Sequence, residues 1–177
     1  MGEATFHTAR LVLRPARLSD LSDLNVVMSD DETMRYWSQE AHSDLAETEA
    51  FLARMMARNH LGQDFVMELD GRAVGKAGAY ALPEVGFILR RDLWGQGLAR
   101  EAMMCLIPHI FATTDVPALT ADVDPRNLGS LRVLDRLGFR ETGRAERTFF
   151  LYGEWANSIY LALSRPKAGI SGNLNGN

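Results

Sequence analysis

Residues 94–99 read Trp-Gly-Gln-Gly-Leu-Ala, and they join an apolar extended run to a helical pattern through two glycines. Glycine adopts backbone angles that other residues avoid, and it leaves room for a ligand to approach the main chain. Free backbone N–H groups at the start of a helix bind anions. The stretch therefore predicts a phosphate cradle or, taken alone, a simple strand-to-helix turn.

A second segment lies about thirty residues further along the chain. It reads Asn127-Leu128-Gly129-Ser130 and leads into Leu137-Gly138-Phe139. Together the two segments resemble the Gcn5-related N-acetyltransferases (GNAT), and in particular the RimJ/RimL-type branch. Trp94 stands where the general family motif favours Gln or Arg, and RimJ/RimL-type sequences often carry an aromatic residue there. The resemblance implies that the glycine turn cradles the pyrophosphate of acetyl-coenzyme A.

Composition narrows the function classes. The chain has 177 residues, of which 46% are hydrophobic and 24% are charged, as expected for one globular domain. Its net charge of −4 argues against a surface built for nucleic acid or anionic lipid. The single cysteine allows no intrachain disulfide, and no stretch has a signal-peptide or membrane-spanning pattern. We therefore expect a cytoplasmic protein with neither a nucleic-acid nor a membrane partner.

Hydrophobic periodicity, capping residues and turn signals divide the chain into elements. They predict a strand over residues 8–15, helices over 19–28 and 43–59, a hairpin over 65–82, a strand over 85–90, a helix over 99–113 that Pro108 kinks or shortens, a strand over 119–123, a helix over 128–137, and two strands around Gly153. This order predicts an α+β fold, a single GNAT-like domain over residues 1–166 with a central mixed, mostly antiparallel sheet flanked by helices. Residues 167–177 are rich in Gly and Asn and predict a disordered tail.

The resemblance also implies a set of residues along the cofactor. The strand backbone of residues 87–89 would run beside the pantetheine arm, next to a bulge where such strands splay. The full set is Phe87, Ile88, Leu89, Trp94, Gly95, Gln96, Gly97, Leu98, Ala99, Arg100, Asn127, Ser130 and Arg136. Asn127 is equally a preferred helix N-cap, and each arginine alone fits a solvated surface charge.

Acyl transfer to an amine needs a neutral nucleophile and a proton for the departing sulfur. By resemblance, Glu84 is the candidate that removes the proton of the amine, although an exposed carboxylate at a strand start explains it equally well. Ser130, or its rival Tyr152, would protonate the thiolate. Tyr36 and Trp37 are candidates for the acceptor pocket or for the core, and Asn157 stands where many relatives carry Asp.

These residues predict an acetyl-CoA-dependent N-acetyltransferase acting directly on a primary amine, either a protein N-terminal α-amine or a small molecule. A coenzyme A-binding module without turnover and an acyltransferase that uses another acyl-CoA are the alternatives. The four histidines show no metal-ligand spacing, so no metal is expected. The sequence leaves monomer and homodimer open.

Overall fold

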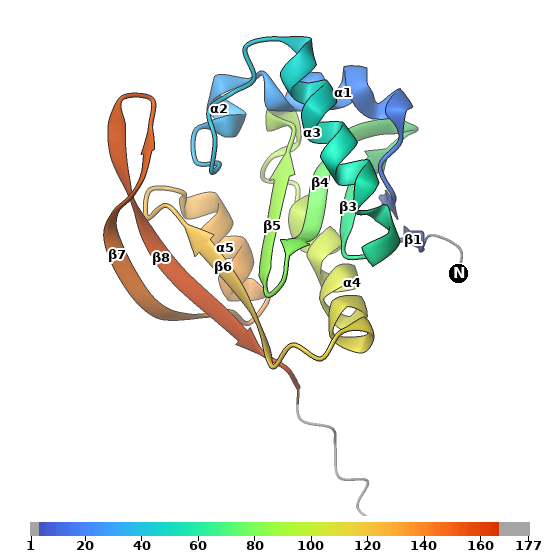
Figure 1. Cartoon of the computed structure of the whole chain (residues 1–177). Coiled ribbons are helices and arrows are strands. Elements are labelled where there is room, and N and C mark those ends of the chain that lie inside the picture. The colour runs from blue at the N-terminus through green and yellow to red at the C-terminus, as the bar shows by residue number, and fades with distance from the viewer. Residues whose placement is uncertain (1–3, 167–177) are drawn as a thin grey trace, which may run out of the picture.

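The structure of the protein is a computed structural model that describes residues 4–166. Eight strands form one sheet in the order β1-β2-β3-β4-β5-β6-β8-β7 (Figure 1). They are β1 (Phe6–His7), β2 (Val12–Arg14), β3 (Asp64–Leu69), β4 (Arg72–Ala81), β5 (Glu84–Leu89), β6 (Ala118–Val123), β7 (Arg140–Leu151) and β8 (Glu154–Ser164). Every neighbouring pair is antiparallel except β5 and β6. The predicted mixed, mostly antiparallel sheet is therefore confirmed.

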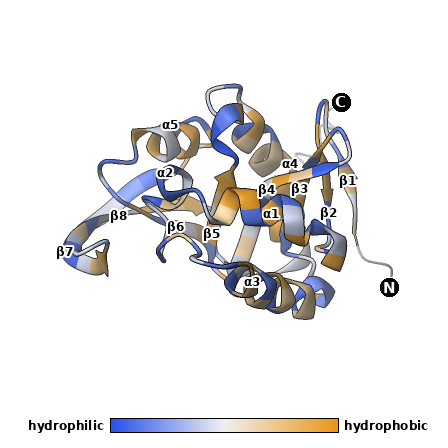
Figure 2. Cartoon of the chain, turned by 90° about the horizontal axis from the view of Figure 1, so that it is seen from above, coloured by the Kyte–Doolittle hydropathy of each residue, from blue (hydrophilic) through white to orange (hydrophobic). Residues whose placement is uncertain are grey.

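Helices cover both faces of this sheet. They are α1 (Leu21–Met28), α2 (Asp31–Met34), α3 (Leu45–Ala57), α4 (Leu98–Thr113) and α5 (Leu128–Arg136), with short 3-10 turns at Leu18–Asp20, Asn59–Leu61 and Arg91–Leu93. The larger core contains buried residues of α4 and α5 packed on the strands, whereas two smaller clusters pack α1, α2 and α3 on the other face. Hydrophobic colouring concentrates on the central strands and on the helix sides that meet them (Figure 2).

Alternation along the strands decides which side chains reach each face. Val85 and Leu89 of β5 belong to the core under α4, and so do Leu119, Ala121 and Val123 of β6. The intervening residues, Glu84 and Asp122 among them, consequently point to the face that carries α1, α2 and α3. This parity places two acidic side chains on one side of the sheet.

The parallel pair β5 and β6 separates almost at once. Their only register pair is Glu84 with Thr120, at the beginning of β5. Beyond it the two strands diverge, so the β5 edge that follows is not paired with β6. The expected splay is thus present, and the nearby register irregularity lies in the β4–β5 pairing, between Gly78 and Ala81.

Two hairpin turns follow from local sequence. Asp70 and Gly71 both have positive φ angles, 50° and 77°, and join β3 to β4 as their Asp-Gly sequence predicts. Tyr152 and Gly153 repeat this geometry with φ angles of 51° and 75° at the β7–β8 turn. The second turn holds the backbone of Tyr152 at the tip of the long hairpin on the left of Figure 1.

Some boundaries differ from the prediction. Of the strand expected over residues 8–15, only β2 is formed, because Thr8 and Leu11 close a turn that separates it from the preceding short strand β1. Helix α3 begins after Asp44, whose carboxylate accepts a hydrogen bond from Glu47 N–H. Helix α4 runs past Pro108 to Thr113, because the N–H group that proline lacks would lie on an exposed side of the helix. The expected tail over residues 167–177 lies outside the described residues.

Candidate active site

The gap between β5 and β6 opens at the end where two helices begin. Because both strands run in the same direction, the helices that follow them, α4 and α5, start at the same edge of the sheet. Both helices pack in the core on one face. Their N-termini therefore meet beside the gap.

The start of α4 has the properties of an anion cradle. Gly97 caps the helix with a φ angle of 81°, and no side chain supplies a capping hydrogen bond there. Gly95 has a φ angle of 75°, and a methyl group added to it would meet no described atom within 4 Å. These features leave the first N–H groups of a 16-residue helix facing outward.

The N-terminal segment fixes this cradle in place. Arg10 donates to the carbonyl of Gln96 at 2.9 Å and forms an ion pair with Glu101 at 2.7 Å. Thr8 donates to the same carboxylate at 2.6 Å. Trp94, which is 46% exposed, donates its indole N–H to the Leu89 carbonyl at 2.7 Å. The turn is thereby tied both to β5 and to the segment that precedes β2.

The other predicted cofactor residues are placed unevenly. Asn127 caps α5, because its side chain accepts a hydrogen bond from Ser130 N–H at 3.1 Å. Arg100 and Arg136 are exposed and form no ion pair within residues 4–166, which leaves their guanidinium groups available. Phe87 packs against the core under α4, whereas Ile88 packs toward α1 and α2. Residues 87–89 follow the register pair, along the edge where β5 leaves β6.

A cavity of about 380 Å³ opens on the opposite face of the sheet. Segments from α2, the chain after it, β5, β6 and the β7–β8 hairpin form its wall. The residues that line it are Asp31, Glu32, Arg35, Tyr36, Trp37, Ser38, Glu84, Asp122, Asp124, Arg126, Phe149, Leu151, Tyr152, Glu154, Ala156 and Asn157. The structure thus brings Tyr36, Trp37, Glu84 and Tyr152 together, as well as Asn157, and it leaves Ser130 out of this wall.

Trp37 belongs to both the cavity and the core. It packs against the cluster formed by α1, α2 and Ile88, and a methyl group added to Gly86 would meet its ring at 3.6 Å. Lys76, which is 4% exposed and paired with Asp64 at 2.8 Å, lies 5.8 Å from the ring centroid. Trp37 therefore serves both as a core residue and as part of the cavity wall.

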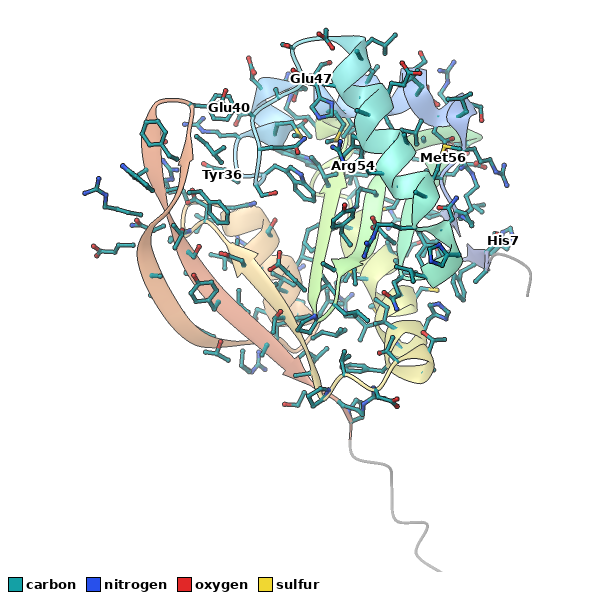
Figure 3. The ribbon with its side chains drawn as sticks, viewed as in Figure 1. His7, Tyr36, Glu40, Glu47, Arg54 and Met56 are labelled. Carbon is teal, nitrogen blue, oxygen red and sulfur yellow. The ribbon has the colours of Figure 1, made fainter. Side chains whose placement is uncertain are left out.

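The hairpin tip is fastened across the cavity. Tyr152 accepts a hydrogen bond from Ala41 N–H through its hydroxyl at 2.8 Å, and its own N–H donates to Glu40 at 2.6 Å. Figure 3 shows Tyr36 and Glu40 on the segment between α2 and α3, on the side that faces the hairpin. Burial raises the pKa of the Tyr152 hydroxyl, and the hydrogen bond from Ala41 works in the opposite direction.

Carboxylates dominate the charge of the cavity. Arg126 is committed to two of them, Asp124 at 2.7 Å and Glu154 at 2.6 Å. Glu84 and Asp122 form no ion pair within the described chain, and Asp122 Oδ1 is buried without a hydrogen-bond partner. Glu84 is an exposed residue, but its partial desolvation at the cavity wall raises its pKa, and the negative charge of Asp122 raises it further. Such a carboxylate is a stronger base than an ordinary glutamate.

Asp122 was not among the residues predicted from the sequence. Its signal was available, because Thr120 and Asp122 are the polar positions in the alternating run over residues 118–123. The sequence alone did not indicate that β6 pairs with β5. Only the β5–β6 register places Asp122 on the same face as Glu84.

The family profile described as acetyltransferase (GNAT) domain matches residues 10–140. The chain belongs to the GNAT family of N-acetyltransferases. Its relatives include the spermidine N(1)-acetyltransferase of Escherichia coli strain K12, 26% identical over 85% of this chain and 84% of that protein. Membership of the family agrees with acyltransferase activity.

Solved structures place the chain near the RimJ and RimL acetyltransferases. Mycobacterium smegmatis RimJ in complex with a CoA disulfide superimposes with a TM-score of 0.76 and 25% identity, over 92% of this chain and 88% of that one. The RimL acetyltransferase of ribosomal protein L7/L12, in complex with coenzyme A, gives a TM-score of 0.80 at 18% identity over 91% and 98%. The fold resemblance to this branch is confirmed.

No helix within residues 4–166 is long and apolar enough to cross a membrane. In the same range, no three His, Cys, Asp or Glu side chains converge on a position where they could hold a metal ion.

Proposed function

We propose that this GNAT N-acetyltransferase moves an acetyl group from acetyl-coenzyme A to a primary amine that enters through the acidic cavity. One observation carries the proposal: β5 and β6 part between the α4 cradle on one face and the cavity on the other. A donor held on the first face and an acceptor on the second would meet in the gap. Bound acetyl-coenzyme A supplies the activated acyl group as a thioester.

The cradle fits the phosphate end of such a cofactor. Its two positive-φ glycines leave the main chain uncovered, and Arg100 and Arg136 have no competing ion pair in the described chain. We assign pyrophosphate binding to the N–H groups of residues 95–100. The β5 edge over residues 87–89, with Asn127 and Ser130 at the start of α5, would line the remainder of the cofactor.

Glu84 is proposed as the base. An alkyl ammonium must lose a proton before its nitrogen can form the C–N bond. Glu84 lies in the cavity wall beside the gap, and its raised pKa makes it a better proton acceptor than an ordinary glutamate. The amide bond then forms as the C–S bond breaks, and the departing thiolate requires a proton.

Ser130 is the better candidate for that last proton. It stands at the start of α5, on the face that we assign to the cofactor, whereas Tyr152 lies in the cavity wall and its hydroxyl is engaged by Ala41. We therefore propose that Ser130 supports the thiolate and that Tyr152 shapes the acceptor pocket together with Tyr36 and Trp37.

The charge of the cavity supports an acceptor that carries positive charge. Six carboxylate side chains and two guanidinium groups line it, and four aromatic rings offer faces to a cation. A polyamine, the kind of acceptor named for the Escherichia coli relative, and a basic protein N-terminus both meet this requirement. An amine with a neighbouring carboxylate would be repelled.

Calorimetric titration with acetyl-coenzyme A and with coenzyme A is the first test. Saturable one-to-one binding, followed by thiol release with an amine, supports transfer, and competition between acetyl- and succinyl-coenzyme A decides the acyl group. A folded protein that binds neither cofactor contradicts the proposal. Cofactor binding without thiol release across monoamines, diamines and peptides would identify a non-catalytic coenzyme A-binding module instead.

A further inference from the structure

The proposed base has an acidic neighbour that no established role explains. Glu84 opens β5 and Asp122 lies in β6, two residues beyond Thr120, the register partner of Glu84. Alternate residues of a strand share a face, so the two carboxylates lie on the same side of the sheet and flank the point where the strands part. Both line the cavity.

Nothing positive neutralises this pair in the described chain. The neighbouring guanidinium of Arg126 is held by Asp124 and Glu154, and Arg35 is paired with Glu32 at 3.4 Å. From β8, the hydroxyl of Ser158 approaches Asp122 and itself contacts Thr148 of β7 at 2.8 Å. Tyr160 of β8 is the register partner of Asp122, and Asp31 lies in the α2 part of the cavity wall.

Asp122 also retains an unused acceptor. Its Oδ1 atom is buried and has no hydrogen-bond partner in the structure. A buried, unpartnered carboxylate oxygen is costly unless something donates to it. A donor that arrives with the substrate, such as an ammonium N–H, would meet that requirement.

We propose that Asp122 and Glu84 form a carboxylate pair that receives the ammonium form of the acceptor, with the free Oδ1 of Asp122 contacting the ammonium group and Glu84 taking its proton. This inference rests on the proposed function. One N–H bond of the ammonium breaks and the proton forms an O–H bond on Glu84, which leaves a neutral amine with a free electron pair. Asp122 holds the amine and keeps its own charge.

The electrostatics agree with this division of work. Two like charges that share a site cannot both remain ionised without cost, so one of them gains proton affinity. Burial raises the pKa of both carboxyl groups; the charge of Asp122 raises that of Glu84 further, whereas the Ser158 hydrogen bond opposes the rise at Asp122. The proton is therefore directed to Glu84.

The test replaces Asp122 with asparagine, which keeps its volume and can still accept from Ser158. In Asp122→Asn, Glu84 becomes a weaker base, so the acidic limb of the kcat/KM profile moves to lower pH. We expect kcat/KM for a cationic amine at neutral pH to fall about tenfold, a part of the roughly 10² to 10⁴ that general acid–base catalysis supplies. In a Glu84→Gln background, Asp122→Asn should move no acidic limb, because the titrating base is gone.

Asp31→Asn is the matched control. It removes a carboxylate from the same cavity, but the charge that acts on Glu84 comes from Asp122. We expect it to change KM for charged acceptors and to leave the midpoint of the acidic limb in place. Asp122→Glu, which restores the charge, should return that midpoint toward its original pH.

A second readout does not depend on turnover. Carbon-13 NMR of the Glu84 carboxyl group reports its titration directly in the wild-type protein and in Asp122→Asn. A lower midpoint in the variant supports the pair, and identical midpoints overturn it. If the wild-type protein acetylates no amine, the proposed function fails, and this titration still decides whether Asp122 tunes Glu84.

Discussion

Two glycines before α4 hold backbone angles that other residues adopt only under strain. Gly95 and Gly97 have φ angles of 75° and 81°, and the side chain that an alanine would add at either position meets no close contact. Within the protein alone, glycine is therefore required at these two positions for its backbone conformation. We propose a second requirement, the close approach of the cofactor phosphate to the main chain. Mutations can separate this requirement from the conformational one.

Gly97→Ala should weaken acetyl-coenzyme A binding and also lower the free energy of unfolding by about 1–2 kcal/mol, the usual cost of a left-handed conformation. Gly97→Val should abolish binding, because its branched side chain obstructs the phosphate. Gly71→Ala is the control, since Gly71 has a φ angle of 77° and nothing within 4 Å of an added methyl group. It should lose similar stability yet titrate normally, and unchanged affinity in folded Gly97→Val would refute the cradle.

Glu84→Gln tests the base. We expect kcat to fall by roughly 10² to 10⁴ while the Kd of acetyl-coenzyme A stays the same. In the wild-type protein, kcat/KM should rise as pH increases through the raised pKa of Glu84, because the ionised carboxylate accepts the proton. Steady-state rates across pH check both statements. A Glu84→Gln protein with full activity would leave Glu84 as a plain surface carboxylate.

At the scale of elements, the β7–β8 hairpin serves as a wall of the acceptor cavity. Phe149, Leu151, Glu154 and Ala156 reach the cavity from it, and Tyr152 fastens its tip to the chain between α2 and α3. The wall thus depends on contacts between segments about 110 residues apart in the sequence. Its position should govern which amines enter more than it governs chemistry.

Tyr152→Phe tests whether Tyr152 shapes the acceptor pocket or donates a proton to the thiolate. Loss of the hydroxyl leaves Ala41 N–H without its partner, which should cost about 1 kcal/mol of stability. We expect KM for the amine to rise while kcat is largely kept. Tyr160→Phe, on the same hairpin, should change neither parameter. A large fall in kcat with constant KM would instead favour Tyr152 as the proton source for the thiolate.

The element order was predictable because each element carries a local signal. Asp70-Gly71 fixes a turn, Asp44 caps α3, and alternating residues mark β6. Pro108 was expected to kink or shorten α4, and it does not shorten it, although a proline removes the hydrogen bond to the residue four positions earlier. Here that residue is Met104, which is 53% exposed, so water can satisfy its carbonyl and α4 continues.

The candidate site was less predictable, because most of its residues come together without a local sequence signal. The glycine turn is local, whereas the cavity combines four separate segments of chain. Asp122 becomes a neighbour of Glu84 only through a single register pair, and Glu40 meets Tyr152 only when the hairpin tip reaches the chain after α2. Such pairings depend on tertiary structure and leave no periodic signal.

At the scale of the whole molecule, a buried charge cluster ties the N-terminal part to the sheet. Arg14 is 5% exposed and makes two hydrogen bonds to Asp20, at 2.7 and 2.9 Å, as well as an ion pair with Glu68 of β3. The cluster joins β2 and β3 to the turn that precedes α1. Removal of one partner would leave an uncompensated charge in the interior.

Asp20→Asn should therefore lower the free energy of unfolding by about 3–5 kcal/mol. Asp135→Asn is the comparison, because Asp135 and Arg140 form an ion pair whose side chains are 75% and 72% exposed. Its loss should cost at most about 1 kcal/mol. Chemical denaturation of the three proteins measures both values, and equal losses would contradict the importance assigned to the buried cluster.

The single register pair between β5 and β6 divides the sheet into two panels, β1–β5 and β6–β8, which meet near Glu84. Amide groups that face the opening lack the ladder that protects those in the panel interiors. Their hydrogens should exchange with solvent sooner, in a strip along one edge of β5. A compound lodged between the panels would slow that exchange, so the seam can report occupancy even when no product is formed.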